Sequence, residues 1–363
     1  MTPPPTRQAP NEWELWLRQW GATRFQLSTK SGWNHYVNAA SRPRPALLSR
    51  SQMRALGEEE LEDYNEARCV WNANPVTIHT PQLAATFGLL DEVMASNSRD
   101  ADRLRGSAVI DAAPALGKTT IATSYARRFH RKAIRRGGAR TPEGHQRLPV
   151  VYVPLSAGAT LKGLNQKILR FYGHPAATRS SRAELGSLVS DCILSCRTQL
   201  VIVDDVHFIH YKWRSGRELS DHLKALANES SATFVYVGVR LREHLFFDEG
   251  LTGEDAAYAQ TSRRATRCEI SPFSIATDAG MRAWVALLAA LEEHLVLAEA
   301  RPGMLTDSAE LLYARTQGSI GSLTNLLDHA CYRAIATGTE TIDEDLLMGV
   351  AGDYAADFLA EAV

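Results

Sequence analysis

A short apolar run followed by a glycine-lysine-threonine sequence constrains the fold of this chain more than any other feature. Residues 108–110 (Ala-Val-Ile) predict a buried parallel strand, and apolar residues recur at helical spacing after Lys118. The segment between them matches the second half of a phosphate-binding loop, in which backbone N–H groups at a helix N-terminus bind phosphate oxygens. The candidate nucleotide-binding residues of this loop are Pro114, Ala115, Leu116, Gly117, Lys118, Thr119 and Thr120.

The chemistry of the loop assigns roles to two of these residues. Lys118 would contact the β and γ phosphates, and the Thr119 hydroxyl would be a ligand of Mg²⁺. The loop departs from the usual pattern because Ala112 stands at the first glycine position and Ala115 replaces a frequent second one. An alanine forced to positive φ costs on the order of 1 kcal/mol, so the loop must use permitted dihedrals or tolerate strain.

A second motif supports nucleotide binding. Residues 200–203 (Leu-Val-Ile-Val) predict a buried strand, and Asp204 and Asp205 follow it directly. Functional groups of parallel sheets gather at the carboxyl ends of the strands, which is also where the phosphate loop would lie. Asp204 is then the candidate Mg²⁺ carboxylate and Asp205 the candidate water-activating acid. The two motifs together predict ATP and Mg²⁺ as cofactors.

The order of strands and helices predicts an α/β nucleotide-binding domain followed by a helical lid. Further strands are expected near residues 149–154, 233–238 and 268–270, whereas the pattern after residue 278 is entirely helical. The expected domains are 1–75, a Trp-rich basic extension for docking or DNA contact; 76–275, the α/β domain; and 276–363, the lid and tail. Segments just before a phosphate loop often contact adenine, which makes Ile78 and Thr80 candidates for that role.

Composition limits the class of protein. A net charge of −1 excludes an overall basic nucleic-acid binder, so any DNA contact must come from local patches. The five cysteines have neither paired spacing nor histidine partners for zinc. The longest apolar run, residues 283–291, is too short to span a membrane, and the N-terminus lacks the apolar core of a signal peptide. These features predict a soluble cytoplasmic protein.

Two segments leave alternatives open. Trp13, Trp16 and Trp20 lie on one face of an expected helix, and these aromatic side chains either form a small core or a docking surface. Residues 127–136 contain six basic side chains, which indicate either a solvated helix face or a contact with a polyanion or another subunit.

The order of these motifs resembles that of the AAA+ ATPases, and more narrowly that of the transposition regulators TniB and TnsC, over roughly residues 45–350. The most specific element is the Gly-Ser-Ile-Gly-Ser-Leu sequence at 318–323, because AAA+ proteins in general usually place a sensor arginine there. The other matching segments are 61–68 with Trp71, 78–81, 203–207, 262–264 and 270–273.

The resemblance implies an AAA+ P-loop domain with a five-stranded parallel sheet flanked by helices, followed by an all-α lid. It implies an ATP-dependent, DNA-binding regulator of DNA transposition that oligomerises as a hexameric ring or helical filament on double-stranded DNA. Such proteins recruit and activate a DDE transposase, often with a TniQ-type target-selection protein. The resemblance also implies a catalytic arginine finger that acts in trans on a neighbouring subunit, and the candidates are Arg263, Arg264 and Arg267. The alternative is that these arginines lie in a solvated turn. The implied DNA-backbone contacts are Thr160 and Lys162, with Lys167 behind them.

Departures from the family pattern indicate slow hydrolysis. Asp205 is one methylene shorter than the usual catalytic glutamate, and Ile320 and Gly321 occupy the place of a sensor arginine. A slow ATPase acting as a switch therefore fits better than a motor. The competing interpretations are a signalling or defence ATPase that senses a protein ligand without DNA, and an ATPase similar to helicase loaders.

Overall fold

The computed structural model describes residues 9–22, 25–98, 105–178, 181–209, 214–230, 232–241 and 265–352. The chain forms two compact units, and each contains segments that are distant in the sequence. Unit 1 is drawn from residues 1–24, 40–80 and 272–363, and unit 2 from residues 25–39 and 81–271. Both nucleotide motifs therefore belong to unit 2.

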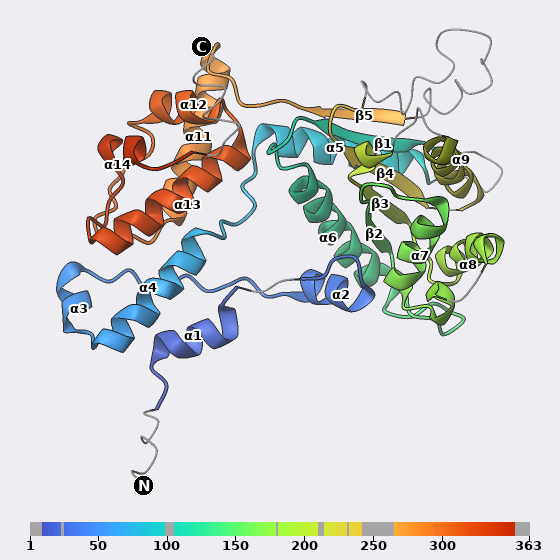
Figure 1. Cartoon of the computed structure of the whole chain (residues 1–363), viewed down its shortest axis with the longest axis horizontal. Helices are drawn as coiled ribbons and strands as arrows, with labels where there is room; N and C mark the ends of the chain where they lie inside the picture. Colours follow the sequence, from blue (N-terminus) through green and yellow to red (C-terminus); the bar gives the residue numbers. More distant parts are fainter. Residues whose placement is uncertain are drawn as a thin grey trace. The chain divides into compact units, whose positions relative to one another are not determined.

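Unit 2 is built on a five-stranded parallel sheet with the strand order β2-β3-β4-β1-β5 (Figure 1). The strands are β1 (Ser107–Ala112), β2 (Val150–Pro154), β3 (Leu200–Asp204), β4 (Thr233–Gly238) and β5 (Ala265–Ile270). The apolar runs seen in the sequence form β1, β2, β3 and β4, which are buried along nearly their whole length. The expected five-stranded parallel sheet is confirmed.

The direction of the connections decides which helices cover each face of this sheet. The connection from β1 to β2 runs along the sheet in the opposite direction to the connections that follow. Because such crossovers are right-handed, α6 lies on one face and α7, α8 and α9 lie on the other, as Figure 1 shows. The α-helices of unit 2 are α2 (Lys30–Asn38), α5 (Pro81–Ser96), α6 (Lys118–Gly137), α7 (Leu161–Tyr172), α8 (Arg182–Ser195) and α9 (Arg214–Glu229).

Helix α2 is part of the core of unit 2, although it lies near the start of the chain. Trp33 is fully buried, and its indole Nε1 donates a hydrogen bond to Nδ1 of His130 on α6 at 3.1 Å. Two arginines of α6 bind the C-terminal end of α2: Arg131 donates to the carbonyl of Val37 at 2.7 Å and Arg127 to that of Ala39 at 2.6 Å. Two arginines of the basic run at 127–136 therefore cap a helix, a role that the sequence did not suggest, although Arg131 is also exposed to solvent.

In the part of unit 1 that the structure describes, the regular secondary structure is helical. Its helices are α1 (Glu12–Trp20), α3 (Arg50–Ala55), α4 (Glu58–Asn72), α11 (Asp278–His294), α12 (Ala309–Thr316), α13 (Ile320–Thr337) and α14 (Glu344–Gly349). The helical region expected after the sheet is confirmed, and its apolar faces form a separate core around Trp284.

Helix α4 is joined to the C-terminal helices of unit 1 by buried polar contacts. The Trp71 indole donates to the carbonyl of His294 at 2.8 Å and stacks on the ring of that histidine at 4.5 Å between centroids. Arg68 forms a two-pronged ion pair with Glu340 at 2.6 and 2.9 Å, and both side chains are almost fully buried. Residues 58–72 thus belong structurally with the end of the chain.

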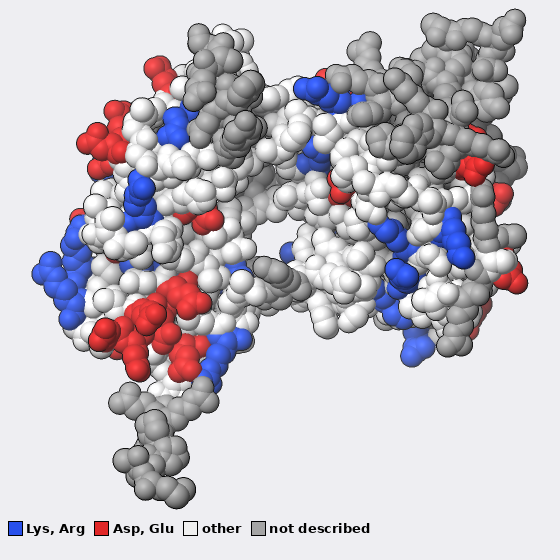
Figure 2. Space-filling view, in the orientation of Figure 1, with Lys and Arg blue, Asp and Glu red and all other residues white. Residues whose placement is uncertain are grey.

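Charged side chains are unevenly distributed over each unit (Figure 2). In unit 1, acidic side chains gather over α1 and α4, whose first turns contain Glu12, Glu14 and Glu58–Glu60. In unit 2, lysine and arginine side chains gather over the region where Figure 1 labels α7. Among the described residues, none of the helices has the length and apolar character needed to cross a membrane.

Candidate nucleotide-binding site

The phosphate loop joins the end of β1 to the start of α6, and its two alanines differ in conformation. Ala112 is the buried last residue of β1 and its φ is negative, so alanine is unstrained at the position of the missing first glycine. Ala115, in contrast, has φ +59°, a left-handed conformation that alanine adopts at a cost. Gly117 caps α6 with φ +76°, where glycine is suited to the geometry.

Lys118 is the first residue of α6 and its side chain folds back over the loop. The Nζ atom donates to the carbonyl of Ala113 at 2.7 Å. Burial lowers the pKa of Lys118, while the carboxylates of Asp204, Asp205 and Asp111 oppose that shift. The ammonium group is thus held at the loop, where the sequence pattern places the phosphates of a bound nucleotide.

The structure brings the two candidate metal residues into direct contact. The Thr119 hydroxyl donates to Oδ2 of Asp204 at 2.8 Å, although 85 residues separate them in the chain. Asp204 ends β3 and is only 2% exposed. Hydroxyl and carboxylate oxygens are the ligands that Mg²⁺ takes from proteins, so this pair fits the metal that accompanies a bound nucleotide.

Tyr152 is a site residue that the sequence interpretation missed. Its hydroxyl donates to the same Asp204 Oδ2 at 2.7 Å, and burial together with Asp204 raises the pKa of this phenol well above its usual value. In the β2–β3 register Tyr152 pairs with Ile202, two residues before Asp204, so both side chains lie on one face. The available signal was a single hydroxyl-bearing residue inside the otherwise apolar run Val-Val-Tyr-Val-Pro.

Asp205 differs from its neighbour in backbone and in environment. It has φ +59° and is the N-cap residue that precedes the short 3₁₀ helix Val206–Phe208. Its own backbone N–H donates to Asp204 Oδ1 at 2.8 Å. Burial and, next, the charge of Asp204 raise the pKa of Asp205, which makes it a better proton acceptor than an ordinary aspartate.

Of the three candidate finger arginines, the structure describes Arg267; Arg263 and Arg264 lie outside the described residues. Arg267 on β5 forms an ion pair with Asp111 on β1, with 2.9 Å between Nη2 and Oδ2. Asp111 is 3% exposed, and its other oxygen accepts from the backbone N–H of Leu241 at 2.9 Å. Arg267 therefore has an acidic partner within its own unit.

The three candidate DNA contacts lie at or near the start of α7. Thr160 is the N-cap of this helix, and its hydroxyl accepts from the N–H of Gly163 at 3.1 Å. Lys162, in the first turn, is exposed. Lys167 donates to the carbonyl of Pro154 at 2.7 Å and to the Ser156 hydroxyl at 3.3 Å. Lys162 is thus available at the surface, whereas Lys167 is bound to the end of β2.

The candidate adenine contacts belong to unit 1. Ile78 is half-buried and packs against the apolar core of that unit, and Thr80 is 8% exposed. Both side chains are thus at least partly buried within unit 1.

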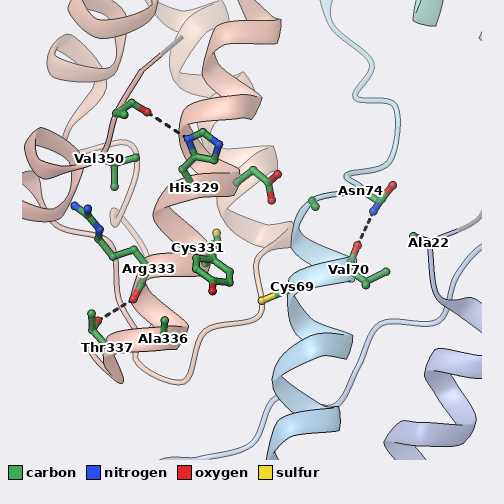
Figure 3. A pocket seen from close by; sticks show the side chains of 14 residues that line it. Ala22, Cys69, Val70, Asn74, His329, Cys331, Arg333, Ala336, Thr337 and Val350 are labelled. Atoms are coloured by element: carbon green, nitrogen blue, oxygen red, sulfur yellow. Dashed lines mark hydrogen bonds between the residues drawn. The ribbon is translucent and has the colours of Figure 1, made fainter.

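A pocket of about 890 Å³ lies within unit 1, between α4 and α13 (Figure 3). Its wall is mainly apolar or small, and Figure 3 shows the Cys69 sulfur of α4 on the side of that helix that faces α13, which carries Cys331 and Ala336. Among the described residues, there is no group of three or more His, Cys, Asp or Glu side chains that could hold a metal ion, in this pocket or elsewhere.

Several solved structures have a fold similar to that of this chain. The fold is similar to that of the Aeropyrum pernix ORC1 protein solved in complex with DNA, with a TM-score of 0.56 and 18% identity over 80% of this chain and 67% of that one. It is also similar to A. pernix ORC2 solved with ADPNP and ADP (TM-score 0.53, 17% identity, 76% and 68% coverage). Cdc6p from Pyrobaculum aerophilum gives a TM-score of 0.53 at 15% identity, with 77% and 74% coverage.

The sequence defines the family more closely. Residues 68–249 match the family model described as bacterial TniB protein. The chain belongs to the TniB family, and it is an AAA+ ATPase that binds nucleotide. A search of curated proteins finds no match.

Proposed function

We propose that this chain is an ATP-dependent, DNA-binding regulator of DNA transposition. In this proposal it oligomerises on target DNA as a ring or filament and recruits and activates a DDE transposase, together with a TniQ-type target-selection protein. The observation that carries the proposal is the family match over residues 68–249, which spans the phosphate loop, the Asp204–Asp205 motif and the start of α7.

The nucleotide half of the proposal assigns a task to each residue of the loop region. The backbone of residues 114–120 and the Lys118 ammonium bind the phosphates, while Thr119 and Asp204 hold Mg²⁺. The metal, when bound, neutralises charge on the phosphate oxygens. Asp205 would accept a proton from the attacking water.

The Asp205 side chain supports slow hydrolysis. The Asp205 side chain is one methylene shorter than glutamate and starts from a left-handed backbone, which restricts where its carboxylate can reach. The ion pair of Arg267 with Asp111 favours Arg263 or Arg264 as the residue that reaches a neighbouring subunit. We therefore propose a nucleotide-dependent switch in preference to a motor.

The DNA half of the proposal rests on the start of α7. Lys162 is exposed in the first turn of a helix whose N-terminus adds positive potential, a combination that suits a phosphate of the DNA backbone. The ordered cap formed by Thr160 and the Lys167 contact with Pro154 would hold this turn in place. Such contacts are independent of base sequence and weaken as salt increases. The DNA in the ORC1 structure is consistent with this part of the proposal.

The test is electron microscopy of the purified protein with double-stranded DNA, in the presence of a non-hydrolysable ATP analogue or of ADP. We expect rings or filaments on DNA with the analogue, and their loss in Lys118→Ala. Lys162→Ala should weaken assembly on DNA, whereas Lys132→Ala, which removes an exposed lysine of α6, should not. Assembly that depends on nucleotide but ignores DNA would contradict the proposal and favour a signalling ATPase. Sensitivity to Lys132→Ala alone would move the DNA contact from α7 to α6.

A further inference from the structure

Asp204 receives more hydrogen bonds than its role as a metal carboxylate requires. Oδ2 accepts from the hydroxyls of Thr119 at 2.8 Å and Tyr152 at 2.7 Å, and Oδ1 accepts from the N–H of Asp205 at 2.8 Å. The Thr119 hydroxyl is itself a candidate metal ligand, and the Asp205 N–H is a local backbone contact. Tyr152 is therefore the side chain whose only task toward Asp204 is to orient it.

The Tyr152 ring is in turn fixed by the N-terminal part of unit 2. The indole of Trp33 stacks on it, with 6.2 Å between ring centroids and 12° between the planes. Trp33 is fully buried and Tyr152 is 6% exposed. The Trp33 indole is held by its hydrogen bond to His130, and the end of α2 is held by Arg127 and Arg131.

We propose that Tyr152 is a positioning residue for the magnesium carboxylate, and that α2 contributes to the nucleotide site by holding the Tyr152 ring through Trp33. Groups that hydrogen-bond to a metal ligand fix its direction, and their loss typically weakens metal affinity by about 10- to 100-fold. A displacement of α2 would then change the affinity for Mg·ATP without touching the phosphate loop. This inference rests on the proposed metal role of Thr119 and Asp204 and is independent of the role in transposition.

The test is the variant Tyr152→Phe, which keeps the ring and its stacking on Trp33 and removes only the hydroxyl. The matched control is Tyr172→Phe, because the Tyr172 hydroxyl is also buried and bonds to the Thr198 hydroxyl at 2.7 Å, away from Asp204 in the hydrogen-bond network. Equilibrium binding of a fluorescent non-hydrolysable ATP analogue is measured while Mg²⁺ is titrated. We expect the Mg²⁺ concentration for half-maximal binding to rise about 10- to 100-fold in Tyr152→Phe and to stay unchanged in Tyr172→Phe. Binding of the analogue without Mg²⁺ should be equal in all three proteins.

The contribution of α2 is tested with Trp33→Phe, alone and combined with Tyr152→Phe. We expect a several-fold rise in the Mg²⁺ requirement for the single variant, and no further rise when it is added to Tyr152→Phe, because both act on the same hydroxyl. Additive effects would refute the connection through Tyr152.

The outcomes also separate this inference from the assignment of the metal site. An unchanged Mg²⁺ titration in Tyr152→Phe, with wild-type binding that depends on Mg²⁺ and is lost in Asp204→Ala, would refute the positioning role alone. Wild-type binding that is indifferent to Mg²⁺ would refute the metal site itself, and the positioning role with it.

Discussion

Ala115 gives the sharpest stability prediction, because two alanines of the same loop should respond to glycine in opposite ways. Ala115 has φ +59°, whereas Ala113, two residues earlier, is outside the left-handed region. A non-glycine residue pays about 1–2 kcal/mol for that conformation. Glycine avoids the cost but loses about 0.5–1 kcal/mol through its greater freedom in the unfolded chain. Ala115→Gly should therefore stabilise unit 2 by a net of about 0.5–1 kcal/mol.

The matched control, Ala113→Gly, incurs the entropic loss without relieving any strain. It should destabilise unit 2 by roughly 0.4–1 kcal/mol, although the carbonyl that accepts from Lys118 remains in place. A change of 1 kcal/mol shifts the midpoint of a domain of this size by about 2–4 °C, so the two variants should move in opposite directions by about 1–4 °C.

The assay is thermal unfolding without nucleotide, followed by circular dichroism. The transition of unit 2 is identified as the one that ATP shifts upward, since a ligand stabilises only the unit that binds it. Destabilisation of Ala115→Gly to the same extent as Ala113→Gly would refute the reasoning, because it would mean that the left-handed conformation of Ala115 carries no strain.

Two further predictions concern buried polar groups. Arg68→Met leaves the Glu340 carboxylate buried without its partner and should lower the free energy of unfolding, measured in urea, by about 3–5 kcal/mol. Adding Glu340→Gln should recover part of that loss. A loss below about 1 kcal/mol in the single variant would contradict this prediction. Burial lowers the pKa of His130 to about 4, below its usual value of 6.5. As the pH falls from 6.5 to 4, this histidine takes up a proton in the unfolded chain before it does so in the folded one, so the stability that is fully present above pH 6.5 is progressively lost. His130→Gln should therefore flatten the fall of the unfolding midpoint between pH 6.5 and 4, and equal slopes in the two proteins would exclude that titration as a cause.

The elements that the sequence determined by itself are those with a local signature. The apolar run before the loop, the Gly117-Lys118-Thr119 sequence and the apolar run before Asp204 each encode their structure within a few residues. Strand and helix periodicity, together with the direction of parallel strands, then sufficed to predict a five-stranded parallel sheet with the two motifs at its carboxyl edge. The contact of Thr119 with Asp204 is the geometric consequence of that prediction.

Only the tertiary structure decided the contacts between distant segments, because no local pattern encodes them. Trp33 meets His130 across 97 residues, Tyr152 meets Asp204 across 52, and Arg267 meets Asp111 across 156. From the sequence, Trp33 was interpreted as an N-terminal aromatic residue, Tyr152 as a strand residue and Arg267 as a candidate arginine finger. Periodicity reports which face of an element is apolar, but it does not report which element covers that face. The placement of α2 in unit 2 and of α4 in unit 1 follows from packing that brings together segments far apart in the chain, and so does the orientation of the metal carboxylate.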